Sequence, residues 1–277
     1  MSNIRGLRDL DQESRPFIRG GQANPQAKSA RDEGFLETLK SVLCPFLSYR
    51  QFTFWISIIQ IAMFTATLAY NGIAINSGFL APSTLALYDF GEKYPFRMRY
   101  NYEVHRFLMP LVLHANLNHI FSNLLSQVML CSSLEASQYL GTRLRTALFY
   151  ILSGFGGVLF SSLISDTMSV GASTSIFGFI GLNIAILIAT WSQLSDQQKG
   201  QQGAFLICIL LLNLTLFQGG SNLVDQYGHL GGFISGLLLG YHLLARTKTH
   251  RIFTTIALLS FYIGGLVVFY TLRKPLP

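Results

Sequence analysis

The sequence predicts an all-α polytopic membrane protein. Half of its 277 residues are hydrophobic and only 12% are charged, which is about half the charged fraction of an ordinary soluble domain. The mean hydropathy is +0.40. Apolar stretches of the length that spans about 30 Å of hydrocarbon recur along the chain. These three observations favour a bundle of membrane-spanning helices.

The apolar stretches divide the chain into three regions. Seven spans are expected, at 53–75, 118–138, 146–165, 173–192, 203–219, 229–245 and 252–271. Residues 1–50 mix both charge signs with Gly, Pro, Gln and Ser, and are expected to form a disordered tail. Residues 51–245 would form a six-helix core, and residues 246–277 a seventh span with a short C-terminus.

The segment 76–117 does not fit a span. It holds three prolines and a charged patch at 92–99. We interpret it as a long structured loop that lies against the membrane interface, because a long loop in a compact fold is usually functional or disordered and this one is rich in aromatic residues.

The basic residues predict the orientation in the membrane. With the N-terminus inside, the inner segments hold fourteen Lys and Arg, and the outer segments hold six. The positive-inside rule therefore places the N-terminus in the cytosol and the C-terminus outside. Ser173 and His229 then both lie at the outer ends of their helices.

Composition also argues against several function classes. The net charge of +7 comes from residues outside the apolar stretches, with no basic stripe interleaved with aromatics, so nucleic-acid binding is not expected. Cys44, Cys131 and Cys208 are scattered without a CxxC pair, which favours neither a disulfide framework nor a metal site. No metal or cofactor is expected.

Ser173 lies in an apolar stretch between Gly171 and Gly178. A serine at the start of a helix has unpaired backbone N–H groups beside it, and these can stabilise a developing oxyanion. Gly171 permits the sharp backbone turn that such a loop needs. The alternative interpretation of an isolated Gly-x-Ser is an N-cap or a small residue at a helix interface.

His229 begins a helical face of small residues. Gly232, Gly236 and Gly240 follow it at i+3, i+7 and i+11, a spacing that lets a neighbouring backbone approach closely. The range 173–192 offers a complementary set of small residues, Gly178, Gly181 and Ala185. If the two faces meet, Ser173 and His229 come within reach of each other. A titratable ring at hydrocarbon depth is costly and indicates function, although a packing motif with an interfacial histidine is the alternative.

A third polar group begins the span at 118–138. His119 and Asn123 are i, i+4 and share a helical face. Both side chains can donate hydrogen bonds, and at the outer end of their helix they would point toward an oxyanion formed at Ser173. A metal site is a less favoured alternative, because no carboxylate or cysteine stands nearby as a further ligand. For His114, in the loop before this helix, a structural hydrogen bond is expected.

Together these residues resemble the signature of the rhomboid intramembrane serine proteases, over about 53–245. The residues that carry the resemblance are Arg106, His114, His119, Asn123, Glu135, Gly171, Ser173, His229, Gly232 and Gly236. The seventh span after the core resembles the six-plus-one arrangement of eukaryotic secretory-pathway members.

The resemblance implies roles for these residues. Ser173 would be the nucleophile and His229 the general base, with no third acid. His119, Asn123 and the Ser173 backbone N–H would form the oxyanion hole. The remaining residues would shape and support the site: Gly171, Arg106, His114, Glu135, Gly232 and Gly236.

The resemblance also implies an activity and a location. The substrates would be single-pass transmembrane proteins, cut within or near the outer part of their helix. The protein would lie in the bilayer of the secretory pathway or the plasma membrane, with its active site open to the extracytoplasmic side.

Two positions depart from the family pattern. His105 stands where the family has a tryptophan before Arg106, so the first loop is expected to anchor differently. Thr174 follows the nucleophile where glycine is frequent, and a threonine there could narrow the oxyanion pocket.

Proteolysis in a membrane needs water, so a hydrophilic cavity must reach Ser173. Its expected lining is a set of polar residues near the outer helix ends: Asn116, Asn118, Ser122, Asn123, Ser175, Asp225 and Gln226. Substrate is expected to enter beside the helix at 203–219, where the glycines at 219, 220 and 228 would let the next loop lift.

Two other functions remain as alternatives. A rhomboid-like pseudoprotease would bind and escort membrane clients, and Thr174 is the feature that favours it. A transporter would use the histidines as proton relays, but it predicts an internal repeat with matching broken helices. The sequence contains no such repeat.

Overall fold

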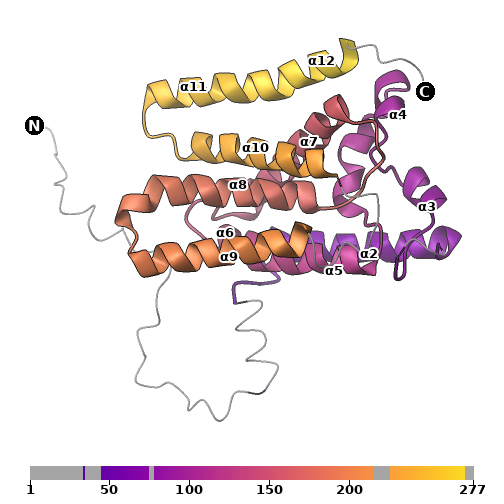
Figure 1. Ribbon diagram of the computed structural model, residues 1–277, viewed down its shortest axis with the longest axis horizontal. Helices are drawn as coiled ribbons and strands as arrows, with labels where there is room; N and C mark the ends of the chain where they lie inside the picture. Colours follow the sequence, from indigo (N-terminus) through magenta and orange to yellow (C-terminus); the bar gives the residue numbers. More distant parts are fainter. Residues whose placement is uncertain (1–33, 35–44, 75–77, 215–224, 272–277) are drawn as a thin grey trace, which may run out of the picture. The chain divides into compact units, whose positions relative to one another are not determined.

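The computed structural model describes residues 34, 45–74, 78–214 and 225–271 (Figure 1). Most of the predicted tail at 1–50 and the glycines at 219 and 220 lie outside these residues. The chain divides into two units, Met1–Val42 and Leu43–Pro277. The fold described below is that of the second unit.

This unit is built from helices, and the described residues include no strand beyond two isolated β-bridges. The long helices are α2 (Phe52–Asn71), α7 (Arg143–Ile164), α8 (Ser173–Thr190), α9 (Asp196–Leu214) and α10 (Gln226–Leu243). The last helical stretch is made of α11 (Lys248–Leu259), the π-helical η6 (Ser260–Gly264) and α12 (Gly265–Thr271). The protein is therefore an all-α polytopic membrane protein.

Four helical stretches are long and apolar enough to cross a membrane: Phe52–Asn71, Arg143–Ile164, Ser173–Gln193 and Lys248–Thr271. Helices also occupy the described parts of the other three predicted spans, of which 203–219 is described only to 214, but these helices do not meet the same criterion. The count of seven spans stays a prediction.

The predicted span at 118–138 is an interrupted helix. It consists of α5 (Leu117–Ser126), a π-helical turn η4 (Gln127–Cys131) and α6 (Ser132–Glu135). The π-turn presents Gln127 to α2, where its amide donates to Ser57 Oγ at 2.8 Å and its Oε1 accepts from Gln60 at 3.2 Å. The buried side-chain amides thus form hydrogen bonds with each other, which lipid could not provide.

Capping residues set where several helices begin. Ser195 and Gln198 form a reciprocal capping box, with each side chain accepting from the other residue's N–H, at 3.3 and 2.9 Å. This box explains why α9 begins at Asp196, before the apolar stretch predicted from 203. Thr142 and Thr247 cap α7 and α11 with their hydroxyl groups, which accept from the N–H groups of Arg145 and His250.

The first loop is structured by short helices: α3 (Thr84–Asp89), α4 (Pro95–Tyr100), η2 (Val104–Phe107) and η3 (Met109–Val112). Arg106 is buried and donates to the carbonyl oxygens of Tyr88 and Glu92, at 3.0 and 2.9 Å. Its guanidinium also lies 4.8 Å from the centre of the Tyr88 ring. His105, in contrast, is exposed. Arg106 therefore holds the loop together without a neighbouring tryptophan.

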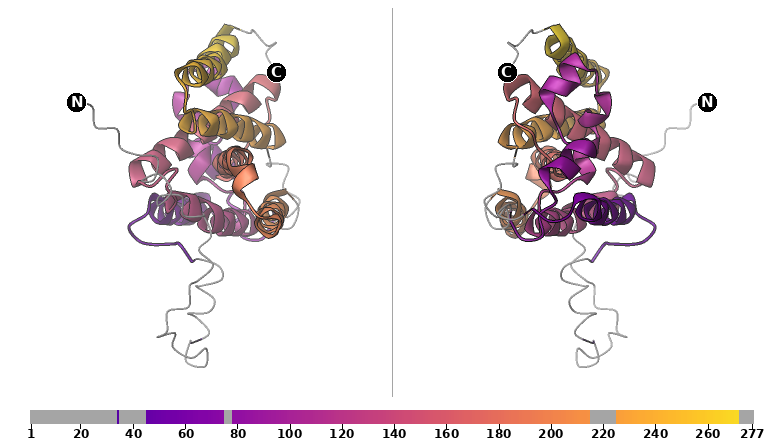
Figure 2. Two further views of the ribbon diagram at one scale, coloured as in Figure 1. Left: turned by 90° about the vertical axis from the view of Figure 1, so that its left-hand side faces the viewer. Right: turned by 90° about the vertical axis from the view of Figure 1, so that its right-hand side faces the viewer.

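Helix α8 lies near the centre of the fold and packs against both α7 and α10, which also contact each other (Figures 1 and 2). Of its most apolar stretch 72% is buried, against 11% for the last helical stretch, which packs along α10 and α7 at the edge. The two faces of small residues meet here. A Cβ atom on Gly236 would lie 2.0 Å from the carbonyl oxygen of Gly178, and one on Gly232 would lie 2.0 Å from that of Thr174. Only glycine permits this approach of α8 and α10.

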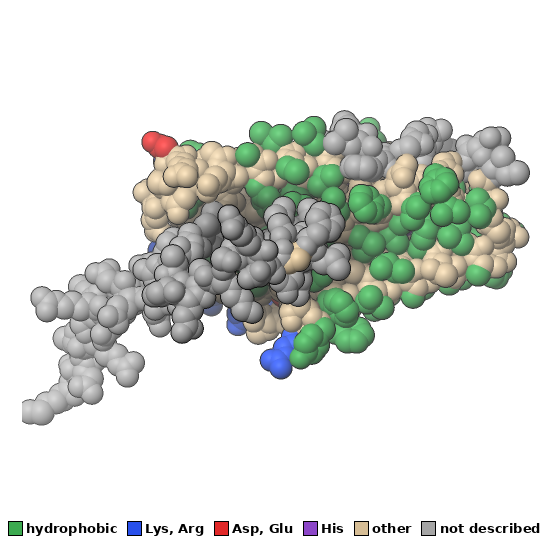
Figure 3. All heavy atoms as spheres, turned by 90° about the horizontal axis from the view of Figure 1, so that it is seen from below, with side chains coloured by type: hydrophobic (Ala, Val, Ile, Leu, Met, Phe, Trp, Pro, Cys, Tyr) green, Lys and Arg blue, Asp and Glu red, His purple; other side chains and the backbone are tan. Residues whose placement is uncertain are grey.

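The outer surface suits a lipid environment. Figure 3 shows one face on which hydrophobic side chains gather over the centre and right, while the few visible charged side chains lie at the left end and along the lower edge. The exposed large apolar residues come from several helices, including Ile58 of α2, Leu148 of α7 and Ile207 of α9. Contiguous apolar surface of this kind marks a membrane or partner contact.

Candidate active site

Ser173 and His229 meet at the matching ends of α8 and α10. Ser173 is the first residue of α8, and His229 lies in the first turn of α10. His229 Nε2 lies 2.7 Å from Ser173 Oγ. Both residues are buried, with 6% and 3% of their surface exposed. Residues 56 positions apart thus form a hydrogen-bonded pair of hydroxyl and imidazole.

Gly171 shapes the loop that presents the serine. Its φ is +137°, a conformation that side chains rarely adopt, and its N–H donates to Pro110 O at 2.9 Å. A Cβ atom at this position would lie 2.8 Å from Nε2 of His119 and 3.4 Å from Ser173 Oγ. The glycine therefore allows the His119 ring to approach the serine.

Phe177 holds the ring of His229 in place. The two rings stack, with centroids 4.3 Å apart and planes 7° apart. Sequence reasoning did not assign this role to Phe177. The signal was its spacing, because a residue four positions after Ser173 lies on the same helical face.

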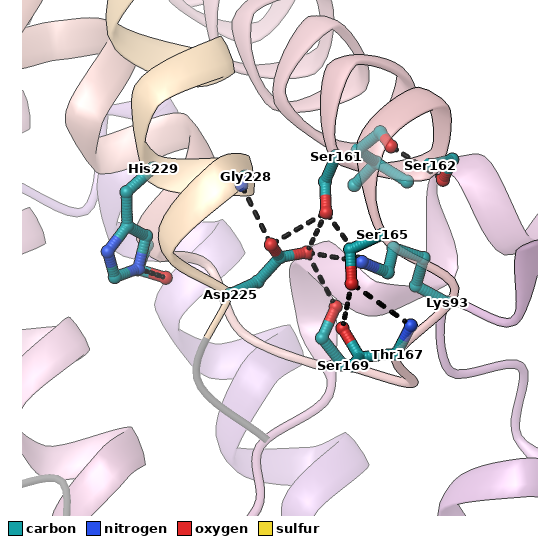
Figure 4. Close-up of polar contacts among 11 residues, drawn as sticks. Lys93, Ser161, Ser162, Ser165, Thr167, Ser169, Asp225, Gly228 and His229 are labelled. Carbon is teal, nitrogen blue, oxygen red and sulfur yellow. Dashed lines mark hydrogen bonds and ion pairs between the residues drawn. The ribbon is translucent and has the colours of Figure 1, made fainter. Parts of the chain in front are cut away.

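The imidazole has no acidic partner in the part of the chain that the structure describes. His229 Nδ1 is buried without a hydrogen-bond partner there. The nearest acid in sequence is Asp225, whose carboxylate points away from the ring (Figure 4). The site is therefore a pair rather than a triad.

His119 is the predicted oxyanion donor that lies beside the pair. Its Nδ1 accepts from the Ala115 N–H at 3.5 Å, so in the neutral ring the proton is assigned to Nε2. That nitrogen faces Gly171 and the serine. Asn123 is buried one turn further along α5, and its amide donates to His119 O at 2.8 Å.

His114 and Glu135 stand further from the serine. The His114 ring contacts His119 edge-on, with centroids 5.4 Å apart. Neither of its ring nitrogens meets a partner in full hydrogen-bond geometry among the described residues, although the Val112 backbone interacts with the ring, so the expected structural hydrogen bond stays a prediction. Glu135 accepts from the N–H groups of Phe52 and Thr53 at 2.6 and 2.9 Å. It therefore caps α2, as a negative charge at a helix N-terminus does.

Thr174 points away from the expected oxyanion pocket. Its Cβ would lie 2.9 Å from a Cβ atom on Gly157, and its Cγ2 2.9 Å from one on Gly228. The side chain therefore packs into the space that these glycines leave on α7 and α10. It does not narrow the side of the site that faces His119.

A cavity of about 450 Å³ reaches His229 between α8, α9 and α10. Its lining is almost entirely apolar: Phe177, Ile180, Ile184, Leu206, Leu210, Gln226, His229, Leu230 and Phe233. Of the expected hydrophilic lining only Gln226 belongs to it. Ser175 Oγ instead donates to Tyr150 O at 2.9 Å, because two residues along a helix turn a side chain to the opposite face.

Within the described ranges, no group of three or more His, Cys, Asp or Glu side chains could hold a metal ion. A hydroxyl, an adjacent imidazole and a nearby donor are the parts of nucleophilic acyl transfer.

Fold and site together define a polytopic membrane protein with a buried serine–histidine pair. Residues 101–246 match the family model of the Rhomboid domain. RHOMBOID-like protein 1 of Arabidopsis thaliana is 32% identical, over 73% of this chain and 57% of its own length. Rhomboid-like proteases 1 and 3 of Toxoplasma gondii are each 31% identical, over 85% and 79% of this chain and 74% and 80% of their own lengths. The chain belongs to the rhomboid family, and the relatives named as proteases support a protease.

Proposed function

We propose that this protein is an intramembrane serine endopeptidase that cleaves single-pass transmembrane proteins within or near the outer part of their helix. The observation that carries the proposal is the 2.7 Å contact between Ser173 Oγ and His229 Nε2. The burial of both residues in a family of membrane proteins supports it further.

The proposed reaction uses these two residues in turn. His229 Nε2 takes the proton of Ser173 Oγ as the oxygen attacks the scissile carbonyl carbon. The imidazolium then gives this proton to the leaving amine, and an acyl ester remains on Ser173. A water molecule, deprotonated by His229, hydrolyses the ester and restores both residues.

Three donors are proposed for the oxyanion: the Ser173 backbone N–H, His119 Nε2 and the Asn123 amide. Ser173 is the first residue of α8, so its N–H has no acceptor within the helix. One such donor contributes about 3–4 kcal/mol in soluble enzymes. Asn123 would have to turn from His119 O, to which it donates now, or use its second N–H.

The substrate would have to unwind before it is cut. A transmembrane helix keeps its carbonyl groups in backbone hydrogen bonds, so small or helix-breaking residues near its outer end are expected. It would enter beside α9, which packs against α5. Water would have to reach Ser173 from the extracytoplasmic side.

The proposed architecture is a six-helix core at 51–245, with the first loop at 76–117 and a seventh helix at 246–277. The N-terminal tail at 1–50 would lie in the cytosol. The proposed location is the secretory pathway or the plasma membrane, where the substrates would share the same bilayer.

Labelling with a fluorophosphonate probe tests the proposal. The full-length protein should react, and Ser173→Ala and His229→Ala should each abolish the signal. Ser175→Ala is the matched control, because this buried serine lies two residues along α8 and bonds to Tyr150 O. Loss of labelling in Ser175→Ala alone, with labelling intact in Ser173→Ala, would contradict the assignment.

A rhomboid-like pseudoprotease remains the second candidate, since Thr174 replaces the frequent glycine after the serine. Co-expression with a tagged single-pass protein separates the two functions. A protease forms a cleaved product that Ser173→Ala removes. A client-binding protein forms no product with either variant.

A further inference from the structure

A second polar cluster lies one helical turn before His229. Lys93 of the first loop and Asp225, which precedes α10, form an ion pair with Nζ and Oδ2 2.6 Å apart. The Lys93 side chain is fully buried and that of Asp225 is 7% exposed. The backbone carbonyl of Asp225 accepts from the His229 N–H at 2.9 Å, and the charge of its carboxylate acts on the imidazole through space. The reaction proposed above uses neither Lys93 nor Asp225.

Further donors surround the carboxylate of Asp225. Ser161 Oγ of α7 lies 2.6 Å from both carboxylate oxygens, and Ser169 Oγ donates to Oδ2 at 2.9 Å. The Gly228 N–H donates to Oδ1 at 2.8 Å, so Asp225 also caps α10. Figure 4 shows the carboxylate at the centre of these contacts, directed away from the imidazole. Burial opposes the charge of Asp225, but Lys93 and these donors outweigh it and lower the pKa of the carboxyl group.

The same cluster also holds the segment that leads to the serine. The backbones of Lys93 and Ser169 pair in an isolated antiparallel bridge, with N–H···O distances of 2.9 and 3.3 Å. Ser169 lies four residues before Ser173, and Asp225 lies four residues before His229. One lysine therefore fixes the approach to both members of the pair, through its backbone on the serine side and its ammonium group on the histidine side.

We propose that Lys93 and Asp225 are positioning residues of the proposed protease, which set the start of α10 against the start of α8 so that His229 Nε2 meets Ser173 Oγ. This inference rests on the proposed function. A buried ion pair is weak evidence for stability, because desolvation offsets much of its attraction. Such a pair instead fixes how the two segments that carry the charges lie against each other, here the first loop and the start of α10.

The placement matters because nucleophilic attack needs the base within hydrogen-bond distance. A misplacement of about 1 Å costs about 100-fold in rate. Lys93→Met would leave the Asp225 carboxylate buried without its cation. The carboxylate would then turn toward water or other donors. This movement would displace the first turn of α10 and therefore His229.

The experiment compares Lys93→Met, Asp225→Asn and the double variant, each as full-length protein in liposomes with a transmembrane peptide substrate. Lys93→Met should lower kcat by about 100-fold and leave KM within about twofold, since the pair does not line the path of the substrate helix. Adding Asp225→Asn should restore at least about tenfold of the lost kcat. The asparagine removes the unpaired charge and keeps an oxygen that accepts from Gly228 N–H.

Arg99→Met is the matched control for a buried cation of the same loop. Arg99 is 5% exposed and donates to Phe269 O of α12 at 2.8 Å and to Ser162 O of α7 at 3.5 Å. Among the described residues these contacts join the last helix to α7 and do not involve α10. The variant should lower the melting temperature and leave kcat within about twofold.

Several outcomes would overturn the inference. They are an unchanged kcat in Lys93→Met, a double variant no faster than Lys93→Met, and a kcat in Arg99→Met that falls as far as in Lys93→Met. Each of these requires a wild-type protein whose cleavage depends on Ser173. A wild-type protein without such cleavage would overturn the proposed function itself, and the inference with it.

Discussion

The imidazole of His229 is held by packing where soluble serine proteases use a carboxylate. In a triad, an aspartate binds Nδ1 and fixes both the tautomer and the orientation of the ring. Here Nδ1 has no hydrogen-bond partner among the described residues, and the stacked ring of Phe177 fixes the plane of the imidazole instead. A flat contact of this kind restricts rotation of the ring but carries no charge.

Phe177→Ala should therefore lower kcat by about 2- to 10-fold, because an aromatic stack contributes about 0.5–1.5 kcal/mol beyond the area it buries. Phe177→Tyr keeps the ring and should stay close to wild type. Phe179→Leu is the control, since Phe179 is fully buried and contacts Phe149 instead of the histidine. It should reduce thermal stability without a comparable loss of kcat. Full activity in Phe177→Ala would show that stacking does not orient the base.

At the scale of elements, the distance between α8 and α10 decides whether the two residues meet. The carbonyl oxygen of Gly178 lies where a Cβ atom on Gly236 would be, with 2.0 Å between them. Below 3.0 Å something must shift, and the obstacle here is backbone, which cannot turn aside as a flexible side chain does. The serine and the histidine are thus brought together by residues that lie five and seven positions further along their helices.

Gly236→Ala should force the two helices apart, lower the melting temperature and abolish labelling of Ser173 by a fluorophosphonate. Overpacking of this kind typically costs about 1–3 kcal/mol. Gly203→Ala is the matched control within α9, because nothing lies within 4 Å of its added Cβ. That change should raise stability by up to about 1 kcal/mol, the difference in helix propensity. Equal behaviour of the two variants would contradict the packing argument.

A second interface, between α5 and α9, bears on how a substrate reaches the serine. Asn213 of α9 donates to Ser126 Oγ of α5 at 2.9 Å, which joins the two helices by a buried polar contact. Substrate access beside α9 would require this contact to open.

Linking the two helices should therefore block cleavage. Ser126→Cys and Asn213→Cys can be joined by a short bifunctional methanethiosulfonate. The background carries Cys208→Ser, which removes the thiol exposed among the described residues, and Cys44→Ser, which removes the cysteine of the N-terminal tail. Cleavage of a transmembrane substrate should stop, and a reductant should restore it. Labelling by a small fluorophosphonate should persist, because the probe does not need the helices to part. Each single-cysteine variant with the same reagent is the control. Unchanged cleavage in the linked protein would rule out access at this interface.

At the scale of the whole molecule, the features that depend on apolar stretches and on the spacing of small residues could mostly be predicted from the sequence. The apolar stretches predict the helices, and the i+3, i+7 and i+11 glycines after His229 predict the face that meets α8. Contacts between distant segments leave no such pattern. Nothing in the sequence around Lys93 indicates that it lies beside Asp225, 132 residues away. Asp225 was instead expected to line a cavity.

Other differences arise from local geometry that composition does not show. The π-turn at Gln127–Cys131 interrupts a stretch whose hydropathy predicts one continuous helix. Thr174 is a residue that could narrow the oxyanion pocket by its size, but its side chain packs into the space left by glycines of neighbouring helices. The helix type at 127–131 and the direction of the Thr174 side chain both depend on packing between helices and not on the local sequence alone.

The first loop makes the stability of the whole protein depend on pH through Glu92. This residue is 3% exposed, and burial raises the pKa of its carboxyl group to about 7 against the opposing charge of Arg106. The unfolded chain has the ordinary value of 4.5. Below that pH both states hold the proton, and the group costs nothing. Between about 4.5 and 7 the unfolded state loses its proton while the folded state keeps it, so stability falls as the pH rises.

Glu92→Gln should therefore raise the melting temperature at pH 8, where the full penalty is present, and leave it nearly unchanged at pH 4.5. The gain is at most a few kcal/mol, since one pKa unit corresponds to about 1.4 kcal/mol. Glu103→Gln should act with the opposite sign at pH 8. Burial opposes ionisation at Glu103 as well, but its contacts with Arg106 and Arg97 prevail and lower its pKa, so its charge stabilises the folded state. Melting curves of both variants at the two pH values test the pair, and a Glu92→Gln protein that is less stable than wild type at pH 8 would show that this carboxylate is paired rather than stranded.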